Sequence, residues 1–364
     1  MTGGSLPERV NLVVLFGGRS AEHDVSCTSA THVLRAADPA RYRITPIGIG
    51  RDGSWALAAG AAKALAEGPD ELPDHLDTAG ETVSPVDVLA SAGATDADAP
   101  TVVLPILHGP MGEDGTVQGL LELADVAYVG AGVLGSAVGM DKAMAKQVLT
   151  ANGIAQARYV ALREDDLKPS TPAWLVEQLG LPLFVKPANM GSSIGVSKAN
   201  TVETLRDAIA LALTYDEWVL VEEAVTGREI EVAVLGGRPP RASVPGEIVP
   251  GAEFYDYEDK YVDDGSQALV PAPLSTAESD EVRALAVRVF EVLRADGLAR
   301  ADFFYEEGRR GWLCNEINTM PGFTPISMYP KLWQATGLSY PALIDELVRL
   351  ALERHGRRRR RTDH

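Results

Sequence analysis

The sequence has little cysteine, no long apolar run and a deficit of positive charge, and each shortage excludes a class of protein. Its two cysteines, Cys27 and Cys314, are too few for a disulfide framework, and no Cys/His cluster has the spacing of a structural zinc site. No stretch of 18 or more apolar residues is present, so we expect no membrane span. The N-terminal residues lack the basic start, apolar core and cleavage site of a signal peptide, so we expect a cytoplasmic protein.

The charge balance is strongly acidic. Lys and Arg number 33 against 51 Asp and Glu, which gives a net charge of −18. Such a chain repels phosphate backbones, so no nucleic-acid partner is expected. Five consecutive arginines between Gly356 and His364 are the exception. Such a run can touch RNA or a membrane, but we interpret residues 357–364 as a solvated, disordered basic tail.

The first part of the chain alternates strand-like and helix-like segments, the pattern of the α/β fold class. A helix is predicted around Val25–Ala37. Buried strands are predicted at residues 11–18, 42–50, 101–109 and 126–132. Strands that alternate with helices predict a mainly parallel sheet with both faces covered. Residues 58–100 are rich in Ala, Gly, Asp and Pro, and we interpret them as a peripheral insertion.

A chain of 364 residues is long for one hydrophobic core, and we expect three domains. The N-terminal α/β domain would cover residues 1–138. The second, 139–225, opens with a predicted helix over 139–153, which Gly153 ends as a C-cap. The third, 226–356, starts with the strand-like run GREIEVAVLGG and ends with the helical run SYPALIDELVRLALERHG.

Two glycine-rich motifs differ in what they predict. Gly130–Gly135 fits G-x-G-x-x-G, but a dinucleotide site also needs an acidic residue at the end of the next strand, and a helix follows instead. No P-loop motif occurs. In VKPANMGSSIGVSK, Lys186 ends a strand, and Gly191–Gly195 follow with Ser192 and Ser193 among them. Glycines let backbone N–H groups approach phosphates and serines add donors, which predicts a phosphate cradle. An ordinary Gly/Ser hairpin is the alternative.

Three glutamates border the next two predicted strands. Glu222 and Glu223 end an apolar strand, and Glu229 begins the following one. Carboxylates at strand ends beside a cleft can accept hydrogen bonds from an adenine amine and from ribose hydroxyls. Solvated charge at a strand end is the alternative.

The segment GLARADFFYEEGRRGWLCNEIN contains two strand-like runs around a turn that we place near Arg309. An antiparallel hairpin folded there puts Asp302 opposite Glu316 and Arg300 opposite Asn318, all on one face. Two opposed carboxylates repel one another unless a cation lies between them, and oxygen ligands of this kind suit Mg²⁺ that also binds phosphates. A salt-bridged cluster around Arg300 is the alternative. A magnesium site, a phosphate cradle and several lysines together indicate ATP.

Over about residues 10–350 the sequence resembles the D-alanine–D-alanine ligases of the ATP-grasp superfamily. The order and spacing of six motifs carry the resemblance: GGRSAEHDVS, LHGPMGEDGTVQG, MDKAMAK, KPANMGSSIGVS, EFYDYEDKY and NEINTMPGFTPISMYPKLW. It implies an ATP-grasp fold of three domains, the first Rossmann-like. It also implies that ATP phosphorylates the carboxylate of one D-alanine and that the amine of a second attacks the acyl phosphate, which yields a peptidoglycan precursor.

For the nucleotide and its metal, the resemblance implies contacts from the second and third domains. They comprise phosphate contacts by Lys142 and Lys186, further ATP contacts by Ser193 and Lys260, an adenine contact by Glu222, backbone contacts at Glu223 and Val225, and a ribose contact by Glu229. The hairpin residues Asp302, Glu316 and Asn318 would bind two Mg²⁺ ions, with Mn²⁺ as a substitute.

For the amino acids, the resemblance implies that Glu22 binds the ammonium of the first D-alanine within a hydrogen-bonded set that includes Ser192 and Tyr261. His108 would lie near the reacting carboxyl group, and Ser327 would hold the carboxylate of the second D-alanine. The family's homodimer is also implied.

The tetrahedral intermediate would be stabilised by Arg300 and the backbone N–H of Gly322. Residues 253–267, which contain Lys260 and Tyr261, would form a lid that closes on ATP and excludes water from the acyl phosphate.

Two other functions remain as alternatives. A D-alanyl–D-lactate ligase is the near one, but such relatives depart from the lid tyrosine, so Tyr261 favours the dipeptide. A non-catalytic nucleotide-binding regulator on the same fold is the distant one, and it predicts loss of the metal ligands or of Arg300, all of which are present.

Overall fold

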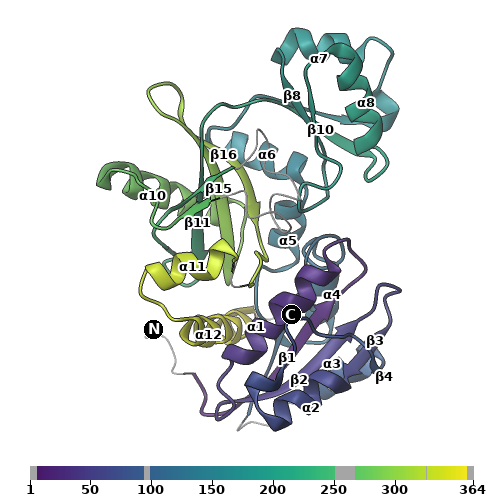
Figure 1. Ribbon diagram of the computed structural model, residues 1–364, viewed down its shortest axis with the longest axis vertical. Coiled ribbons are helices and arrows are strands. Elements are labelled where there is room, and N and C mark those ends of the chain that lie inside the picture. Colours follow the sequence, from purple (N-terminus) through teal and green to yellow (C-terminus); the bar gives the residue numbers. More distant parts are fainter. Residues whose placement is uncertain (1–5, 94–98, 251–266, 325, 359–364) are drawn as a thin grey trace, which may run out of the picture.

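A computed structural model of the protein describes residues 6–93, 99–250, 267–324 and 326–358. These residues form three β-sheets with helices packed around them (Figure 1). This architecture confirms the predicted α/β class, while the domain boundaries stay a prediction. Within the described ranges, no helix combines the length and apolarity needed to cross a membrane.

The N-terminal sheet has the strand order β4-β3-β2-β1-β5-β6. Its strands are β1 (Val10–Gly17), β2 (Tyr42–Ile49), β3 (Trp55–Ala58), β4 (Gly80–Thr82), β5 (Thr101–Ile106) and β6 (Ala127–Tyr128), and its helices are α1 (His23–Ala36), α2 (Ala59–Glu67), α3 (Pro85–Gly93) and α4 (Thr116–Leu123). β1 pairs in parallel with β2 and β5, and β5 with β6. β1 is an almost continuous apolar run and is buried along nearly its whole length, as a covered parallel strand requires.

Two expectations for this sheet need correction. Residues 58–100 are not simply peripheral, because β3 and β4 extend the sheet with antiparallel pairing and Leu72, Leu76 and Leu89 are buried in the core. The strand predicted over 126–132 covers only two residues, because Gly130 turns the backbone with a φ of +102°.

The helix predicted over 139–153 is two helices, α5 (Val133–Met140) and α6 (Lys142–Ala151). Asp141 separates them: its backbone is extended, and its side chain accepts a hydrogen bond from the N–H of Met144 as the N-cap of α6. After Asn152, Gly153 follows with a φ of +66°, as the predicted C-cap requires.

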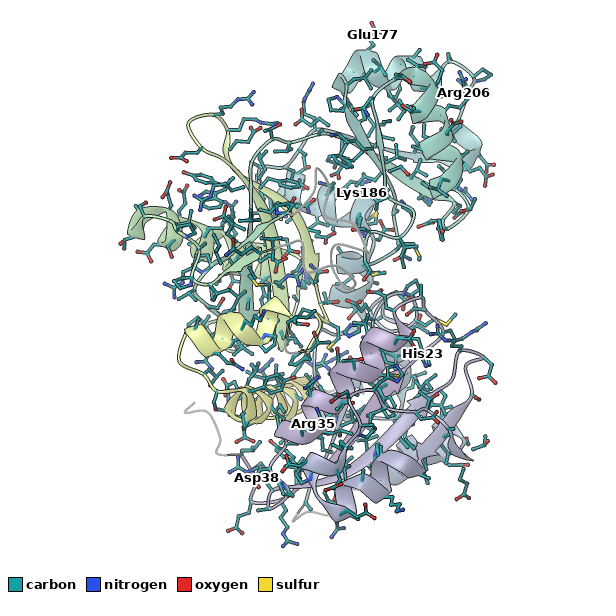
Figure 2. All side chains as sticks on the ribbon, in the orientation of Figure 1. His23, Arg35, Asp38, Glu177, Lys186 and Arg206 are labelled. Atoms are coloured by element: carbon teal, nitrogen blue, oxygen red, sulfur yellow. The ribbon has the colours of Figure 1, made fainter. Side chains whose placement is uncertain are left out.

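The central sheet has the order β7-β10-β8-β9 and is antiparallel throughout. Its elements are β7 (Tyr159–Arg163), β8 (Leu183–Pro187), β9 (Ser197–Ala199), β10 (Trp218–Glu223), α7 (Thr171–Leu179) and α8 (Val202–Ala212). In Figure 2, Lys186 lies where this unit faces the rest of the molecule, whereas Glu177 and Arg206 lie on its outer side. The unit therefore presents the predicted phosphate cradle inward.

The third sheet has the order β14-β13-β11-β15-β16, with β12 paired to β11. Its elements are β11 (Arg228–Leu235), β12 (Arg241–Ala242), β13 (Gly246–Val249), β14 (Gln267–Leu269), β15 (Leu298–Glu306), β16 (Gly311–Asn318), α10 (Thr276–Val292), α11 (Met328–Ala335) and α12 (Tyr340–Arg358). α12 returns to the N-terminal sheet and lies beside α1, and its leucines share one hydrophobic core with β1 and β5 (Figure 1). This shared core joins the first and last parts of the chain.

Arg357 and Arg358, which we predicted as the start of a disordered tail, belong to a helix instead. α12 continues through Arg358, because acidic side chains hold its last two arginines: Arg357 donates to Asp296 at 3.0 Å, and Arg358 pairs with Glu122. Residues 359–364 lie outside the described part of the chain.

Candidate active site

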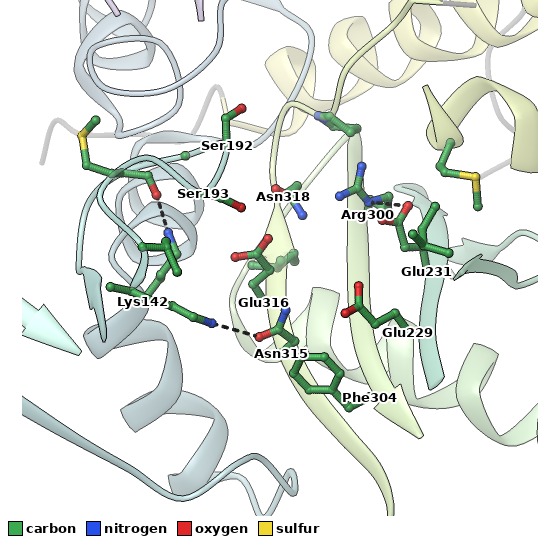
Figure 3. Close-up of a pocket in the computed structure, with 18 of the residues that line it drawn as sticks. Lys142, Ser192, Ser193, Glu229, Glu231, Arg300, Phe304, Asn315, Glu316 and Asn318 are labelled. Carbon is green, nitrogen blue, oxygen red and sulfur yellow. Dashed lines mark hydrogen bonds and ion pairs between the residues drawn. The ribbon is translucent and has the colours of Figure 1, made fainter. Parts of the chain in front are cut away.

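One large cavity of about 1090 Å³ is lined by residues of the central and third sheets and by α1 and loop residues of the N-terminal unit (Figure 3). Of the eighteen predicted site residues, Lys260 and Tyr261 lie outside the described residues, as does the predicted lid apart from Gln267. Fifteen of the other sixteen line the cavity: Glu22, His108, Lys142, Lys186, Ser192, Ser193, Glu222, Glu223, Val225, Glu229, Arg300, Glu316, Asn318, Gly322 and Ser327. The remaining one, Asp302, is buried and bonded to two side chains that line the cavity, Arg300 and Asn318.

The β15–β16 hairpin has the predicted pairing at the site. Arg300 is opposite Asn318 and Asp302 is opposite Glu316. The turn centre predicted at Arg309 is wrong, however, because Glu306 pairs with Gly311 and the turn is centred between Gly308 and Arg309.

A β-bulge reconciles the two observations. Phe303 pairs with Cys314 while Asp302 pairs with Glu316, so Asn315 is an extra residue in β16. In a regular ladder from this turn, Asp302 would face Asn315, and Glu316 would point to the other side of the sheet. The bulge therefore brings Glu316 to the cavity face, where Figure 3 shows it beside Asn315.

Arg300 lies between two carboxylates. Its Nε and Nη2 each donate to Asp302 at 2.8 Å, and its Nε lies 3.0 Å from an oxygen of Glu231 on the neighbouring strand β11. Asn318 Nδ2 also donates to Asp302 at 2.8 Å. The salt-bridged cluster considered as an alternative is thus present, and it includes Glu231, which the sequence argument did not single out.

The same hairpin face has the donor set of a magnesium site. Among the described residues, no group of three or more His, Cys, Asp or Glu side chains is arranged to hold a metal ion. Asp302, Glu316 and Asn318 instead offer two carboxylates and one amide on one face. Mg²⁺ in nucleotide sites takes only one or two carboxylates, with phosphates and water completing its coordination, so this set fits the ion.

Two predicted phosphate ligands line the cavity, Lys142 at the start of α6 and Lys186 near the end of β8. Lys142 donates to the carbonyl of Met190, and burial lowers its pKa. Lys186 Nζ lies 2.5 Å from Glu222 and donates to Asn315 at 3.4 Å. Burial lowers the pKa of Lys186, but the nearby carboxylates outweigh burial and raise it overall. Lys186 is therefore charged, as phosphate binding requires.

The nucleotide side of the cavity combines apolar walls with the predicted glutamates. Its apolar lining includes Ala157, Pro182, Phe184, Val225, Phe304 and Ile317. Glu222 lies at this wall and is 3% exposed. The Glu223 side chain instead pairs with Arg158 at 2.7 Å and with Arg310 at the hairpin tip. The backbone contact predicted for this residue stays a prediction.

The loop after β8 approaches Glu22 on the N-terminal unit. Ser192 donates a hydrogen bond to Glu22 Oε1, and Ser192 and Ser193 have left-handed φ values of +47° and +58°. Consecutive non-glycine residues in this region are strained, and such strain is concentrated at ligand sites. Glu22 Oε2 is buried and accepts no hydrogen bond from any residue that the structure describes. This oxygen is available to an ammonium group.

Replacing Gly191 with alanine is expected to raise the KM for D-alanine, the substrate that the resemblance implies, by about tenfold or more, because a 1 Å displacement of a binding group is enough for such an effect. A Cβ at this position would lie 2.6 Å from Glu22 Oε2. Steady-state ligation rates against D-alanine concentration test this. Gly60→Ala is the matched control, since a Cβ there meets no atom within 4 Å. An unchanged KM in Gly191→Ala would contradict this placement of Glu22.

Residues of the N-terminal unit hold the segment that follows β16 through hydrogen bonds to Met320 and Phe323. Glu113 accepts hydrogen bonds from the N–H groups of Gly109 (2.8 Å) and Met320 (3.3 Å). His108 Nδ1 lies 3.0 Å from the carbonyl of Met320, so it donates there, and the N–H of Phe323 donates to the Ser29 hydroxyl at 3.3 Å. These bonds fix the backbone on both sides of Gly322. Glu113 lies in a quoted motif, but nothing in the sequence marks it as buried.

Glu113 also makes stability depend on pH. Burial, with the nearby charge of Glu22, raises its pKa to about 8 from an ordinary 4.5. The folded protein therefore holds this proton to higher pH than the unfolded chain does, and stability falls as pH rises between these values. Glu113→Gln is expected to weaken that fall, measured as Tm from about pH 5 to pH 9. A steeper loss in the variant than in the wild type would contradict the assignment.

Gly322 and Ser327 lie together at the start of α11. A Cβ at Gly322 would be 2.7 Å from the Ser327 hydroxyl, so the glycine permits this close approach. Ser327 accepts a hydrogen bond from the N–H of Thr324 at 3.1 Å and precedes the first residue of α11. Both residues line the cavity, as Arg300 does.

Comparison with known proteins identifies the family. A family model described as D-ala D-ala ligase N-terminus matches residues 11–131, and one described as D-ala D-ala ligase C-terminus matches residues 148–349. The D-alanine–D-alanine ligase of Arthrobacter sp. (strain FB24) is 48% identical over 365 residues, which is 94% of each chain.

Solved structures agree with this match. The D-alanine–D-alanine ligase from Coxiella burnetii is 35% identical with a TM-score of 0.79, and the alignment covers 96% of both chains. The VanG D-Ala:D-Ser ligase from Enterococcus faecalis is 33% identical with a TM-score of 0.78, over 94% of this chain and 99% of that one. The fold, the cavity and both halves of the sequence agree: this chain belongs to the D-alanine–D-alanine ligase family.

Proposed function

We propose that this protein uses ATP to join two D-alanine molecules into D-alanyl-D-alanine. One observation carries the proposal: the two predicted phosphate lysines, Glu316 and Asn318 of the hairpin, Arg300 and the Glu22–Ser192 pair all line one cavity, and Asp302 is bonded to Arg300 and Asn318 behind it. Each element alone has an ordinary structural explanation. A ligase needs all of them within reach of one carboxyl group.

The chemistry needs no protein nucleophile. A carboxylate is a poor electrophile, so an oxygen of the first D-alanine takes the γ-phosphoryl group of ATP and ADP leaves. The amine nitrogen of the second D-alanine then bonds to the carbonyl carbon, loses a proton, and phosphate departs. The enzyme contributes position and charge stabilisation.

Each predicted nucleotide and metal residue has a proposed role, and that of Lys260 rests on the resemblance alone. Lys142 and Lys186 would hold the ATP phosphates, together with Ser193 and, in the lid, Lys260. Asp302, Glu316 and Asn318 would hold two Mg²⁺ ions, or Mn²⁺, which neutralise phosphate charge. Glu222 would accept from the adenine amine, the backbone of Glu223 and Val225 would contact the base, and Glu229 would take the ribose hydroxyls.

The amino acids would occupy the side of the cavity nearer the N-terminal unit. Glu22, which accepts a hydrogen bond from Ser192, would bind the first ammonium group, and the buried Oε2 of Glu22 supports this role. The role of Tyr261 in the same set rests on the resemblance alone. Ser327 would hold the second carboxylate, with His108 near the reacting carboxyl. Arg300 and the N–H of Gly322 would stabilise the oxyanion. We further propose that the enzyme works in the cytoplasm as a homodimer and supplies peptidoglycan synthesis.

The deciding assay measures phosphate release from ATP and Mg²⁺ with D-alanine and, in parallel, with L-alanine. Release that depends on D-alanine and yields the dipeptide is expected. ATP hydrolysis at a rate that does not depend on D-alanine would contradict the proposal. ATP binding without hydrolysis would favour the non-catalytic regulator. Adding D-lactate or D-serine as the second substrate tests selectivity: ester or mixed-dipeptide formation that matches the D-alanine rate would overturn the choice of second substrate.

A further inference from the structure

A buried lysine that the proposed mechanism does not use lies against the adenine-recognition residue. Lys146, on α6, is 2% exposed, and its Nζ lies 2.5 Å from Glu222 Oε1. Lys186 lies 2.5 Å from the other carboxylate oxygen, Oε2. Glu222 therefore has one lysine on each oxygen, and only Lys186 reaches the phosphate side of the cavity.

The surroundings of Lys146 hold it in place. Its ammonium lies 5.4 Å from the centre of the Tyr159 ring, a distance that permits a cation–π contact. Tyr159 is opposite Glu222 in the β7–β10 pairing, so ring and carboxylate share one face of the sheet. Lys146 is absent from the cavity lining, whereas Lys186 and Glu222 are part of it. Lys146 is thus behind the binding surface and does not touch a ligand.

The two lysines cannot have the same role during turnover. A lysine that binds a phosphate turns its ammonium toward that phosphate and shares less of its charge with Glu222. A buried carboxylate without a cation takes up a proton, since burial favours the neutral form. Burial alone would raise the pKa of Glu222, and the two lysines reverse this and hold the pKa at about 2. When Lys186 engages ATP, Lys146 is the cation that stays.

Ionisation matters because of what an adenine offers. The exocyclic amine of adenine donates a hydrogen bond, and an ionised carboxylate can only accept. A protonated Glu222 would instead donate, which suits a base with a carbonyl at the same position, such as the hypoxanthine of inosine triphosphate.

We propose that Lys146 is a positioning residue for nucleotide specificity: it holds Glu222 ionised and fixed in place, so that the enzyme selects a base carrying an amine over one carrying a carbonyl. This inference rests on the proposed role of Glu222 in binding adenine.

The experiment compares kcat/KM for ATP and for inosine triphosphate in the wild type, Lys146→Met, Glu222→Gln and the Lys146→Met/Glu222→Gln double variant. Lys146→Met is expected to reduce the ATP preference by about tenfold or more, mainly through a higher KM for ATP. A purely structural loss would lower both rates equally and leave the ratio unchanged. Lys168→Met, at an exposed position, is the control that should change neither rate.

The double variant isolates the mechanism. It also stays measurable if the single variant folds poorly, because it removes Lys146 together with the Glu222 charge that Lys146 neutralises. Its ATP preference should equal that of Glu222→Gln alone. If Lys146→Met lowers the preference equally in both backgrounds, or leaves it intact, the inference is overturned. Lys146→Arg keeps the charge and should keep most of the preference; loss as large as in Lys146→Met would also overturn it. An unchanged preference in Glu222→Gln would instead overturn the proposed adenine contact itself.

Discussion

Replacing Arg300 with alanine is expected to lower kcat for ligation on the order of a hundredfold to a thousandfold, while ATP still binds. The guanidinium lines the same cavity as Gly322 and is held by Asp302 and Glu231. Charge that develops on the carbonyl oxygen would lose its only arginine among the described lining residues. Single-turnover dipeptide formation, together with titration of ATP binding, measures both parts of this prediction.

Stability must be separated from catalysis in this variant. Arg300→Ala leaves two buried carboxylates without their cation, which costs about 3–5 kcal/mol when one partner of a buried pair is removed. Arg300→Lys keeps a positive charge but loses the two-pronged contact with Asp302. Compared with Arg300→Ala, we expect Arg300→Lys to have a Tm much closer to that of the wild type but little more ligation activity. Ligation near the wild-type rate in either variant would remove Arg300 from the oxyanion site.

The hairpin shows how far the sequence argument reaches. Strand alternation correctly predicted that Asp302 faces Glu316, although the turn was placed at the wrong residue. The true turn centre lies half a residue before Arg309, and the extra residue Asn315 in β16 restores the predicted pairing of Asp302 with Glu316. Nothing in the local sequence marks a bulge, because bulges depend on twist and on neighbouring strands. The predicted pairing is therefore correct at Arg300 and Asp302 but wrong by one residue between Phe303 and the turn.

Local patterns predicted β1, the Lys186 loop and the α12 helix because each follows from periodicity and turn residues. These patterns could not predict the contacts that Lys146, Glu231 and Glu113 make at the site. Each of these side chains acts through a partner on another element, at Glu222, Arg300 and Met320. Such pairs come from tertiary packing, and a single sequence carries no signal for them beyond an isolated charge.

Glu316→Gln is expected to lower the ligation rate on the order of a thousandfold at ordinary Mg²⁺ concentrations, because a metal-bound phosphoryl group loses several kcal/mol of charge stabilisation. The substitution keeps the size of the side chain and removes its charge. Ligation rates over a wide range of Mg²⁺ concentration, with Mn²⁺ as a second ion, measure it. Glu307→Gln, at the exposed tip of the same hairpin, is the matched control.

The Mg²⁺ series also decides between the two interpretations of this hairpin face. The charge of Glu316 favours the protonated form of Lys142, Lys186 and Arg300, although burial still lowers the pKa of Lys142 overall. Glu316 is therefore also placed to serve purely as their counter-ion. A counter-ion role predicts a loss of activity that added Mg²⁺ does not change. A ligand role predicts that the loss shrinks as Mg²⁺ rises, because weaker binding is overcome by concentration. An unchanged Mg²⁺ dependence in Glu316→Gln would therefore leave the salt-bridged cluster as the explanation for these carboxylates.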